Sequence, residues 1–428
     1  MQEAGRVVVA ADPRGRQRQR TPPPTSTPWH FAPLHRHDVV YLENVFKPSD
    51  LAAFPDNNLD AALRNFVAEP ALRIEPLGDG HLHETFLVEF PPSSGLSRLV
   101  LQRVNTRVFT DVPAVMENIA RVTAHARARL LAREATDGGA ELDRRVLTLR
   151  PTRAGATYAS AADGQVFRAF DYIANSVALN EPENANSAYE AGRALGEFAQ
   201  LLADLPAPAL HITLPNFHAP EQRFLQLSAA LADDPVGRAC DVQLEWQSIV
   251  AREPLAYECV NWRRDPQLRL RVTHNDTKLN NVLFDAETRR ALCVVDLDTV
   301  MPGYLAFDFG DLVRTCVCSV AEDSEQLADV QLRLDYFEAL ARGYLSELAS
   351  DLTPLEHQSL ARGPLWIVLE LAMRFLTDYV NGDRYFKIER PDHNLVRARV
   401  QLRLLSELEQ HQTQLAELLA ASRPRAQK

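Results

Sequence analysis

Hydrophobic and polar residues alternate along several short stretches in the first third of the chain. Residues 72–90 (LRIEPLGDGHLHETFLVEF) hold two such stretches on either side of a Gly-Asp-Gly segment, which predicts a β-hairpin with a glycine-containing turn. Residues 97–105 (SRLVLQRVN) continue the alternation and predict a third strand. Two more strands are expected within residues 144–173, where Asp163-Gly164 marks a turn.

The apolar spacing then changes to the helical period. A helix is expected at residues 112–132 (VPAVMENIARVTAHARARLLA), and a shorter one precedes the hairpin at residues 59–67. Residues 174–187 are polar and are expected to connect the first part to a helix at residues 188–205, after which most of the chain has helical spacing. This order predicts a first lobe of β-β-β-α-β-β type and a larger, mainly helical second lobe.

Domain boundaries are expected where these patterns change. Residues 1–37 are rich in arginine and proline and are expected to form a disordered tail, whose apolar patch is too short for the core of a signal peptide. The first lobe is expected to span residues 38–173 and the second lobe residues 174–420, followed by a short tail at residues 421–428. A chain of 428 residues is long enough for this arrangement.

Composition and charge narrow the class of protein. Hydrophobic residues make up 46% of the chain and charged residues 24%, as in ordinary globular proteins. The 57 acidic and 46 basic side chains give a net charge of −11, which disfavours nucleic acid and anionic membranes as partners. No apolar run approaches the length of a membrane span. The five scattered cysteines lack CxxC spacing and are expected to be reduced thiols, which favours a cytoplasmic protein; no obligate protein partner is indicated.

Two polar clusters separated by apolar strands occur in residues 272–298 (VTHNDTKLNNVLFDAETRRALCVVDLD). The runs NNVLFD and RALCVVD have strand length and are joined by a short connection, which predicts an antiparallel hairpin. Such a hairpin brings Asp276 and Asn281 near Asp296. Because burying polar groups is costly unless each has a partner, the cluster is either a solvated surface hairpin or a ligand site.

The spacing of the cluster favours a ligand site. His274-x-Asp276, followed five residues later by Asn281, has the spacing of a kinase catalytic loop, in which the aspartate receives the substrate proton and the asparagine binds metal. Asp296 takes the place of the metal-binding aspartate, and Lys278 could reach a terminal phosphate. His274 is expected to tie the backbone of the loop.

The first lobe offers further candidates for phosphate binding. Arg103 on the third strand is placed like the strand lysine that holds the α- and β-phosphates in kinases, and Glu117 on the following helix could pair with it. The turn that holds Gly78 and Gly80 could fold over the phosphates through backbone N–H groups. Taken alone, Arg103 and Glu117 are equally consistent with a surface ion pair, and the two glycines with an ordinary hairpin turn.

The segment FDFGDL contains Asp308 and Asp311 and resembles a metal-binding DFG motif. Asp296 already stands at the end of the strand that follows the catalytic loop, where the metal-binding aspartate is expected. Asp308 is therefore expected to brace the loop.

The ordered motifs HNDTKLNN, VVDLDTVMPG and DFGD resemble those of the aminoglycoside phosphotransferase and choline kinase superfamily, and more narrowly the N-acetylhexosamine 1-kinase group. The resemblance covers roughly residues 70 to 410 and includes LGDGHLHETFLV, LQRVNTRVFTDVPAVMEN, FHAPEQR, RFLTDYVNGDRYF and HNLVRARVQLRLL. It implies an α+β, protein-kinase-like two-lobed fold, with a small N-terminal antiparallel β lobe carrying a helix and a larger, mainly helical C-terminal lobe. The nucleotide would bind at the hinge near residues 170–176.

The resemblance also implies an activity, the transfer of the γ-phosphate of ATP to the anomeric 1-hydroxyl of an N-acetylhexosamine in the presence of Mg²⁺. Asp276 would then be the base for that hydroxyl. Asn281 and Asp296 would hold the magnesium. Asp298 would assist through water or a second metal, or would cap a turn.

Acceptor binding is implied for Arg374 and Tyr385, which match positions that contact the sugar in that family. Other acceptors remain open at this point: another sugar, an amino alcohol or an aminoglycoside. A nucleotide-binding pseudokinase would keep the fold without turnover. The chain departs from the family pattern in the two-glycine turn, in HET at residues 83–85, and in having Arg103 in place of a lysine.

Overall fold

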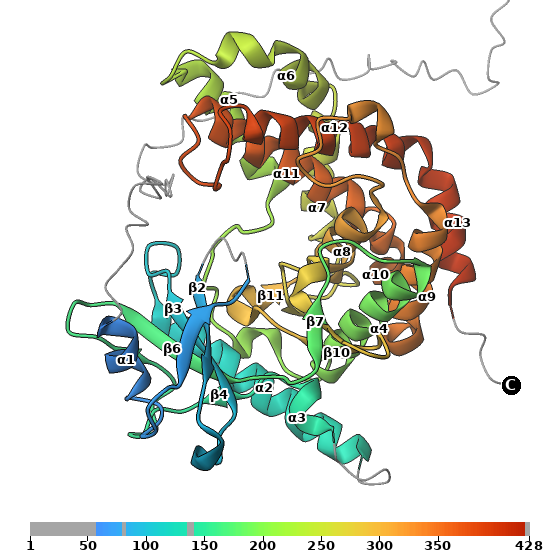
Figure 1. Ribbon diagram of the computed structural model, residues 1–428. Coiled ribbons are helices and arrows are strands. Elements are labelled where there is room, and N and C mark those ends of the chain that lie inside the picture. The colour runs from blue at the N-terminus through green and yellow to red at the C-terminus, as the bar shows by residue number, and fades with distance from the viewer. Residues whose placement is uncertain (1–56, 79–82, 135–140, 424–428) are drawn as a thin grey trace, which may run out of the picture. The chain divides into compact units, whose positions relative to one another are not determined.

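The computed structural model describes residues 57–78, 83–134 and 141–423 (Figure 1). The expected tail at residues 1–37 lies outside this part of the chain, as does Gly80. Within the described part, none of the helices combines the length and apolar character that crossing a membrane requires.

An antiparallel sheet forms the first part of the described chain. Its strands lie in the order β1-β2-β3-β6-β4, and β5 pairs with β6. The predicted hairpin, third strand and following helix are confirmed. The elements of this part are α1 (Asn57–Leu63), β1 (Arg73–Pro76), β2 (Glu84–Glu89), β3 (Arg98–Val104), α2 (Val112–Glu134), α3 (Leu142–Arg145), β4 (Leu149–Arg150), β5 (Ala159–Ser160) and β6 (Val166–Asp171).

The two faces of the sheet have different neighbours. Leu101 on β3 is buried in an apolar cluster with α1. Gln102, the next residue, lies opposite Arg168 of β6 on the other face, where Arg168 contacts the sulfur of Met116 on α2. Because side chains alternate along a strand, Arg103 shares the Leu101 face and points away from α2.

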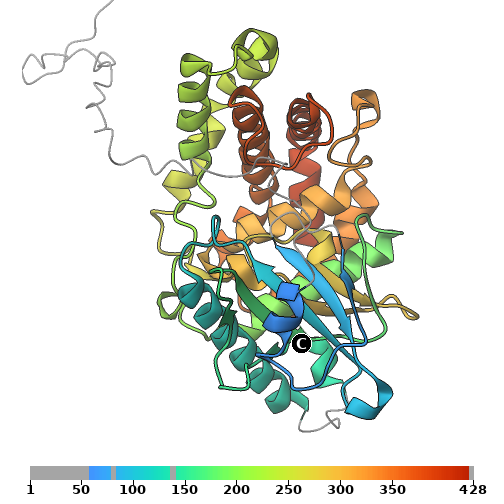
Figure 2. The same cartoon turned by 60° about the vertical axis from the view of Figure 1, so that its left-hand side comes forward.

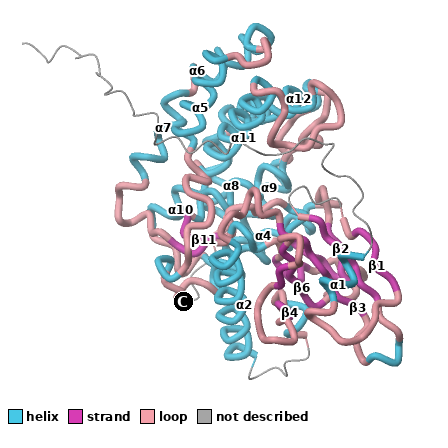
Figure 3. The backbone as a smooth tube through the Cα atoms, turned by 90° about the vertical axis from the view of Figure 1, so that its left-hand side faces the viewer, coloured by secondary structure: helices cyan, strands magenta, loops and turns pink. Residues whose placement is uncertain are grey.

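Helices make up most of the remainder, with short strands between them. The elements are β7 (Ser176–Ala178), α4 (Ala185–Leu201), α5 (Pro220–Asp233), α6 (Gln243–Val250), α7 (Glu253–Trp262), β8 (Arg271–Thr273), β9 (Val282–Asp285), β10 (Ala291–Val294), β11 (Met301–Gly303), α8 (Leu305–Val317), α9 (Leu334–Leu348), α10 (Pro354–Leu360), α11 (Gly363–Val380), α12 (His393–Gln410) and α13 (Gln412–Ala421). The helices α5, α6 and α12 gather at the end away from the sheet (Figure 2), and Figure 3 shows the strands β1 to β6 grouped apart from them.

The predicted hairpin of the second part is confirmed as β9 and β10. They pair antiparallel, with Val294 opposite Val282. Strand β7 adds to this pair along β9, and it lies inside residues 174–187, which were expected to be only a connector. A strand of three residues is too short to show an alternating pattern, and its partner lies far along the chain. A separate pair, β8 and β11, brackets the hairpin in sequence.

Helix α4 packs closely against α9 because glycines line the contact. A Cβ atom added to Gly196 would lie 2.4 Å from the carbonyl oxygen of Tyr344, and one added to Gly192 would lie 2.2 Å from the carbonyl oxygen of Leu340. Only glycine permits this approach of two backbones. Helix α4 also packs against β10, the strand that ends two residues before Asp296.

Candidate active site

The loop that carries Asp276 is held by a buried network. Both oxygens of Asp308, at the start of α8, accept backbone hydrogen bonds, from His274 at 2.8 Å and from Asn275 at 2.7 Å. His274 Nε2 lies 2.9 Å from the carbonyl oxygen of Val295, and the N–H of Asp276 donates to His274 Nδ1 at 3.2 Å. The roles expected for Asp308 and His274, bracing and tying the loop, are confirmed.

The hairpin brings the second half of the motif back to this loop. Asn281 Nδ2 donates to the carbonyl oxygen of Asp276 at 2.7 Å and to its Oδ2 at 3.3 Å. Val295 N–H donates to the carbonyl oxygen of Asn281 at 2.9 Å, which places Asp296 directly beside the asparagine. Lys278 Nζ lies 3.2 Å from Asp276 Oδ2. The predicted convergence is therefore present.

Charges around Asp276 keep its carboxylate ionised. Burial alone would raise the pKa of Asp276, but the surrounding charges, chiefly that of Lys278, more than offset this, so its pKa is lowered. The pKa of Lys278 is raised, mainly by Asp276 and also by Asp296. The loop thus carries a carboxylate and an ammonium side by side at neutral pH.

Asp296 combines backbone strain with the nearby negative charge of two other carboxylates. Its backbone is left-handed, with φ 60° and ψ 57°, a conformation that costs a non-glycine residue about 1–3 kcal/mol and that clusters at functional sites. Among the described residues, its carboxylate accepts no side-chain hydrogen bond. The pKa of Asp296 is raised by burial and then by the negative charges of Asp298 and Asp276.

These features fit a hard divalent cation. Asp296 and the Oδ1 atom of Asn281 offer oxygen donors, which Mg²⁺ prefers, and the surplus negative charge is of the kind that a cation relieves. His83, Asp296 and Asp298 also form a group whose potential ligand atoms lie within 4.8 Å of one another. An imidazole is a poor ligand for magnesium, and His83 Nε2 lies 3.2 Å from Asp298 Oδ1 instead.

Asp298 is bound by an arginine from the sheet. Its Oδ1 and Oδ2 accept hydrogen bonds from Nη1 and Nη2 of Arg168, both at 2.6 Å, and the two side chains are 2% and 1% exposed. Nε of Arg168 donates to Gln102 Oε1 at 3.0 Å. Burial would raise the pKa of Asp298, but Arg168 and His83 outweigh it and lower the pKa.

This buried pair joins β6 to the residues that follow Asp296. Sequence reasoning missed Arg168, because it stands alone within the apolar strand VFRAFD and belongs to no motif. The only available signal was a charged residue at the centre of a buried strand, which requires a partner.

The structure corrects the expected pairing of Arg103 with Glu117, while their phosphate-binding role stays a prediction. Arg103 pairs with Glu84 and donates to Gln165 Oε1 at 2.9 Å, on the face of the sheet opposite Arg168. Glu117 lies half-exposed on α2. Its carboxylate accepts a hydrogen bond from Arg121 at 2.5 Å and lies 2.9 Å from His211 Nε2. The predicted Arg103–Glu117 pair is wrong, since one residue along a strand changes the face that a side chain occupies.

Gly78 lies two residues after the end of β1 and has a positive φ of 73°. A non-glycine residue would be strained in this conformation, so Gly78 suits the turn that the sequence predicted. Its phosphate-binding role, like that of Gly80 outside the described residues, stays a prediction.

Arg374 and Tyr385 meet on the helical side. Arg374 lies on α11, and its Nη2 is 3.5 Å from the hydroxyl of Tyr385. Its guanidinium stands 5.5 Å from the ring centre of Phe217, 5.7 Å from that of Tyr385 and 5.5 Å from that of Phe386. The pair expected to contact the acceptor is thus brought together in an aromatic setting.

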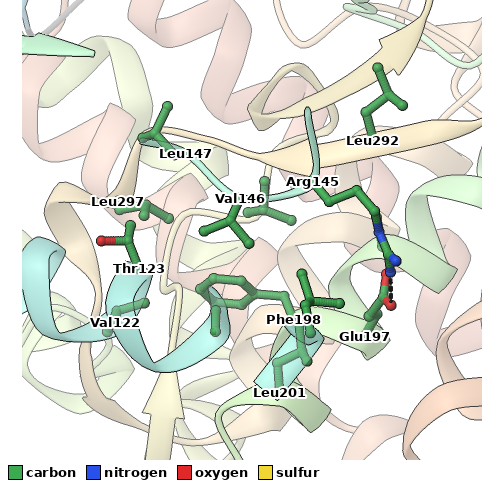
Figure 4. A pocket seen from close by; sticks show the side chains of 14 residues that line it. Val122, Thr123, Arg145, Val146, Leu147, Glu197, Phe198, Leu201, Leu292 and Leu297 are labelled. Carbon is green, nitrogen blue, oxygen red and sulfur yellow. Dashed lines mark hydrogen bonds and ion pairs between the residues drawn. The ribbon is translucent and has the colours of Figure 1, made fainter. Parts of the chain in front are cut away.

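A separate cavity lies between α2 and α4 (Figure 4). Its walls are mainly apolar, and the ion pair of Arg145 with Glu197 lies at its edge. Leu297 contributes to the wall, but none of the predicted site residues does. The cavity therefore lies behind the segment that follows Asp296 and is distinct from the candidate active site.

Comparison with known proteins agrees with this geometry. A sequence model described as the phosphotransferase enzyme family matches residues 73–345, more than half of the chain. The structure of a microcompartment-associated aminopropanol kinase is similar with a TM-score of 0.52 at 16% identity, covering 84% of this chain and 98% of the other. The structure of a spectinomycin phosphotransferase in complex with ADP and spectinomycin is similar with a TM-score of 0.50 at 10% identity, covering 84% of this chain and 100% of the other. These likenesses show a protein-kinase-like fold.

Proposed function

The chain belongs to the phosphotransferase enzyme family, and we propose that it transfers the γ-phosphate of ATP to the anomeric 1-hydroxyl of an N-acetylhexosamine. The observation that carries the proposal is the convergence of Asp276, Asn281 and Asp296 at one end of the hairpin, with Lys278 beside the first of them. Positioning and charge stabilisation are the main demands of phosphoryl transfer, and this cluster meets them.

Asp276 is the proposed base. Its Oδ2 is engaged by Asn281 and Lys278, whereas its Oδ1 accepts no hydrogen bond from the described residues. The hydroxyl of the acceptor donates to Oδ1, its oxygen attacks the γ-phosphorus, and the bond from that phosphorus to the bridging oxygen of ADP breaks. The hydroxyl proton passes to Asp276, and Lys278 faces the transferred phosphoryl group.

Asn281 and Asp296 are the proposed ligands of Mg²⁺, which when bound neutralises charge on the nucleotide phosphates. Asp298 was expected to assist the metal, but both of its oxygens already accept hydrogen bonds from Arg168. We therefore propose that Asp298 positions Asp296, two residues before it, rather than binding the metal directly.

The charge around the acceptor residues favours a neutral sugar over a cationic acceptor. Arg374 beside Tyr385 is accompanied by Arg223 of α5, whose pKa is lowered by burial and by the positive charge of Arg374. Two guanidinium groups at this place disfavour an amino alcohol or an aminoglycoside, which carry positive charge. An N-acetylhexosamine is uncharged and offers hydroxyl and amide groups that arginine and tyrosine can bind.

The test is ADP release with a panel of acceptors at fixed ATP and Mg²⁺: N-acetylglucosamine, N-acetylgalactosamine, glucose, aminopropanol, choline and kanamycin. Turnover is expected with the N-acetylhexosamines. Turnover confined to the cationic acceptors would overturn the proposed substrate class. Nucleotide binding without turnover on any acceptor, in a wider panel as well, would indicate a pseudokinase.

A further inference from the structure

His218, in the segment FHAPEQR, stands between two hydrogen-bond acceptors. Its Nε2 is 2.8 Å from the carbonyl oxygen of Asn275, and its Nδ1 is 3.2 Å from Oε1 of Glu370 on α11. The ring stacks on Phe307 with centres 4.9 Å apart and planes 6° from parallel. Both polar side chains are shielded from solvent, His218 at 8% exposure and Glu370 at 0%.

The two contacts require two ring protons. A carbonyl oxygen and a carboxylate can only accept hydrogen bonds, and a neutral imidazole has a single N–H to donate. We propose that Glu370 holds His218 as a buried imidazolium, and that this imidazolium positions the catalytic loop. The positioning role rests on the proposed function, whereas the protonation state does not.

The surroundings favour the charged form. Glu370 from α11 and Asp308 and Asp311 from α8 place negative charge near the ring, while Arg223 from α5 faces Glu370. On the far side, Arg263 of the segment after α7 lies 6.0 Å from the centre of the Phe307 ring. Burial would lower the pKa of His218, but the charge of Glu370, the hydrogen bonds to Glu370 and Asn275 and the charge of Asp311 together outweigh it, and the pKa is raised.

The ring acts on the peptide unit that precedes the proposed base. The carbonyl oxygen of Asn275 and the N–H of Asp276 belong to one peptide plane. His218 binds the oxygen of that plane at 2.8 Å, and His274 accepts from its N–H at 3.2 Å. Asn275 itself is left-handed, with φ 66°, so the plane is held in a conformation that needs outside support.

Loss of the second ring proton would turn a hydrogen bond into a contact between two lone pairs. At a pH above the raised pKa of His218, the donor to Glu370 or to Asn275 disappears, and the peptide plane before Asp276 loses a restraint. A displacement of the base by about 1 Å costs on the order of a hundredfold in rate. The wild-type kcat should therefore fall on the alkaline side.

The variant Glu370→Gln removes the negative charge at residue 370 but can keep both hydrogen bonds of the His218 ring. A glutamine amide can donate to Nδ1 of a neutral imidazole, which still donates from Nε2 to Asn275, so both hydrogen bonds survive at every pH. The alkaline fall in kcat should then disappear, while the acid limb that belongs to Asp276 remains. His218→Ala removes the donor to Asn275 altogether and should lower kcat by about 10- to 100-fold, with the KM for ATP little changed.

The direct experiment is nitrogen NMR of the intact protein labelled at its histidine rings, with the His218 signals identified by their loss in His218→Ala. At neutral pH the wild-type ring should show two protonated nitrogens, and Glu370→Gln should show one. One protonated nitrogen in the wild type would overturn the inference. An alkaline fall that persists in Glu370→Gln would overturn the positioning role. Two protonated nitrogens in a protein that turns over no acceptor would support the imidazolium and count against the proposed function alone.

Discussion

The buried pair of Arg168 and Asp298 allows a quantitative test of how the sheet supports the segment that carries Asp296 and Asp298. In Arg168→Met, Asp298 would keep a buried carboxylate that is 2% exposed and has lost its bidentate partner. Breaking a buried ion pair by removing one partner costs about 3–5 kcal/mol, because the remaining charge is uncompensated. Replacing both partners, Arg168→Met with Asp298→Leu, should recover most of that loss, because no charge stays buried.

The assay is denaturant unfolding at neutral pH, with a control from the neighbouring ion pair of Arg150 and Asp171. That pair joins β4 to β6, but its side chains are 29% and 42% exposed, so Arg150→Met should cost no more than about 1 kcal/mol. Equal losses in Arg150→Met and Arg168→Met, or a double variant no more stable than Arg168→Met, would refute the reasoning.

The same variant has an expected dependence on pH. The folded-state pKa of Asp298 is lowered, so its contribution to the free energy of unfolding is fully present above the unfolded pKa of about 4 and is lost as the pH falls through the folded value. Without Arg168 the buried carboxyl takes up a proton more readily. The difference in the free energy of unfolding between wild type and Arg168→Met should therefore become smaller below about pH 4. A difference that grew there would contradict the lowered pKa of Asp298.

Four further outcomes are expected. Asp276→Asn should lower kcat by about 10²- to 10⁴-fold with ATP affinity largely kept, as measured by single-turnover kinetics and nucleotide titration; near-normal turnover would remove Asp276 as the base. Because the pKa of Asp276 is lowered, the acid limb of kcat/KM should begin below about pH 4, and a limb near neutrality would place the base elsewhere. Arg374→Ala should raise the KM of the sugar far more than that of ATP, and equal effects on both would argue against a sugar contact. Gly196→Ala should cost about 1–3 kcal/mol in thermal unfolding, since its Cβ would meet the carbonyl oxygen of Tyr344; an unchanged Tm would mean that α4 and α9 can separate freely.

Much of the candidate site could be predicted because its chemistry is local. Asp276, Asn281 and Asp296 lie on one short hairpin, and the apolar runs between them determine that the chain returns to its starting point. Alternation along β3 indicates that Leu99, Leu101 and Arg103 share a face. Alternation cannot tell which face meets α2, because that depends on where α1 packs, and Arg103 was paired with Glu117 for this reason.

The missed residues act through partners far along the chain. Arg168 is a single charge in an apolar strand, and its partner Asp298 follows much later. Likewise His218 lies just before α5 and Glu370 lies on α11, so they meet only when α11 packs beside α5. No period or spacing in the sequence relates such residues, and only the folded packing makes them neighbours.

The central claim is that the hairpin cluster directs phosphate to the anomeric hydroxyl of an N-acetylhexosamine. Phosphorus NMR of the product formed from N-acetylglucosamine or N-acetylgalactosamine with ATP and Mg²⁺ tests it most directly. The predicted result is a sugar phosphate whose phosphorus couples to the anomeric proton, absent with Asp276→Asn. A phosphate on another hydroxyl, or product formation undiminished in Asp276→Asn, would contradict it.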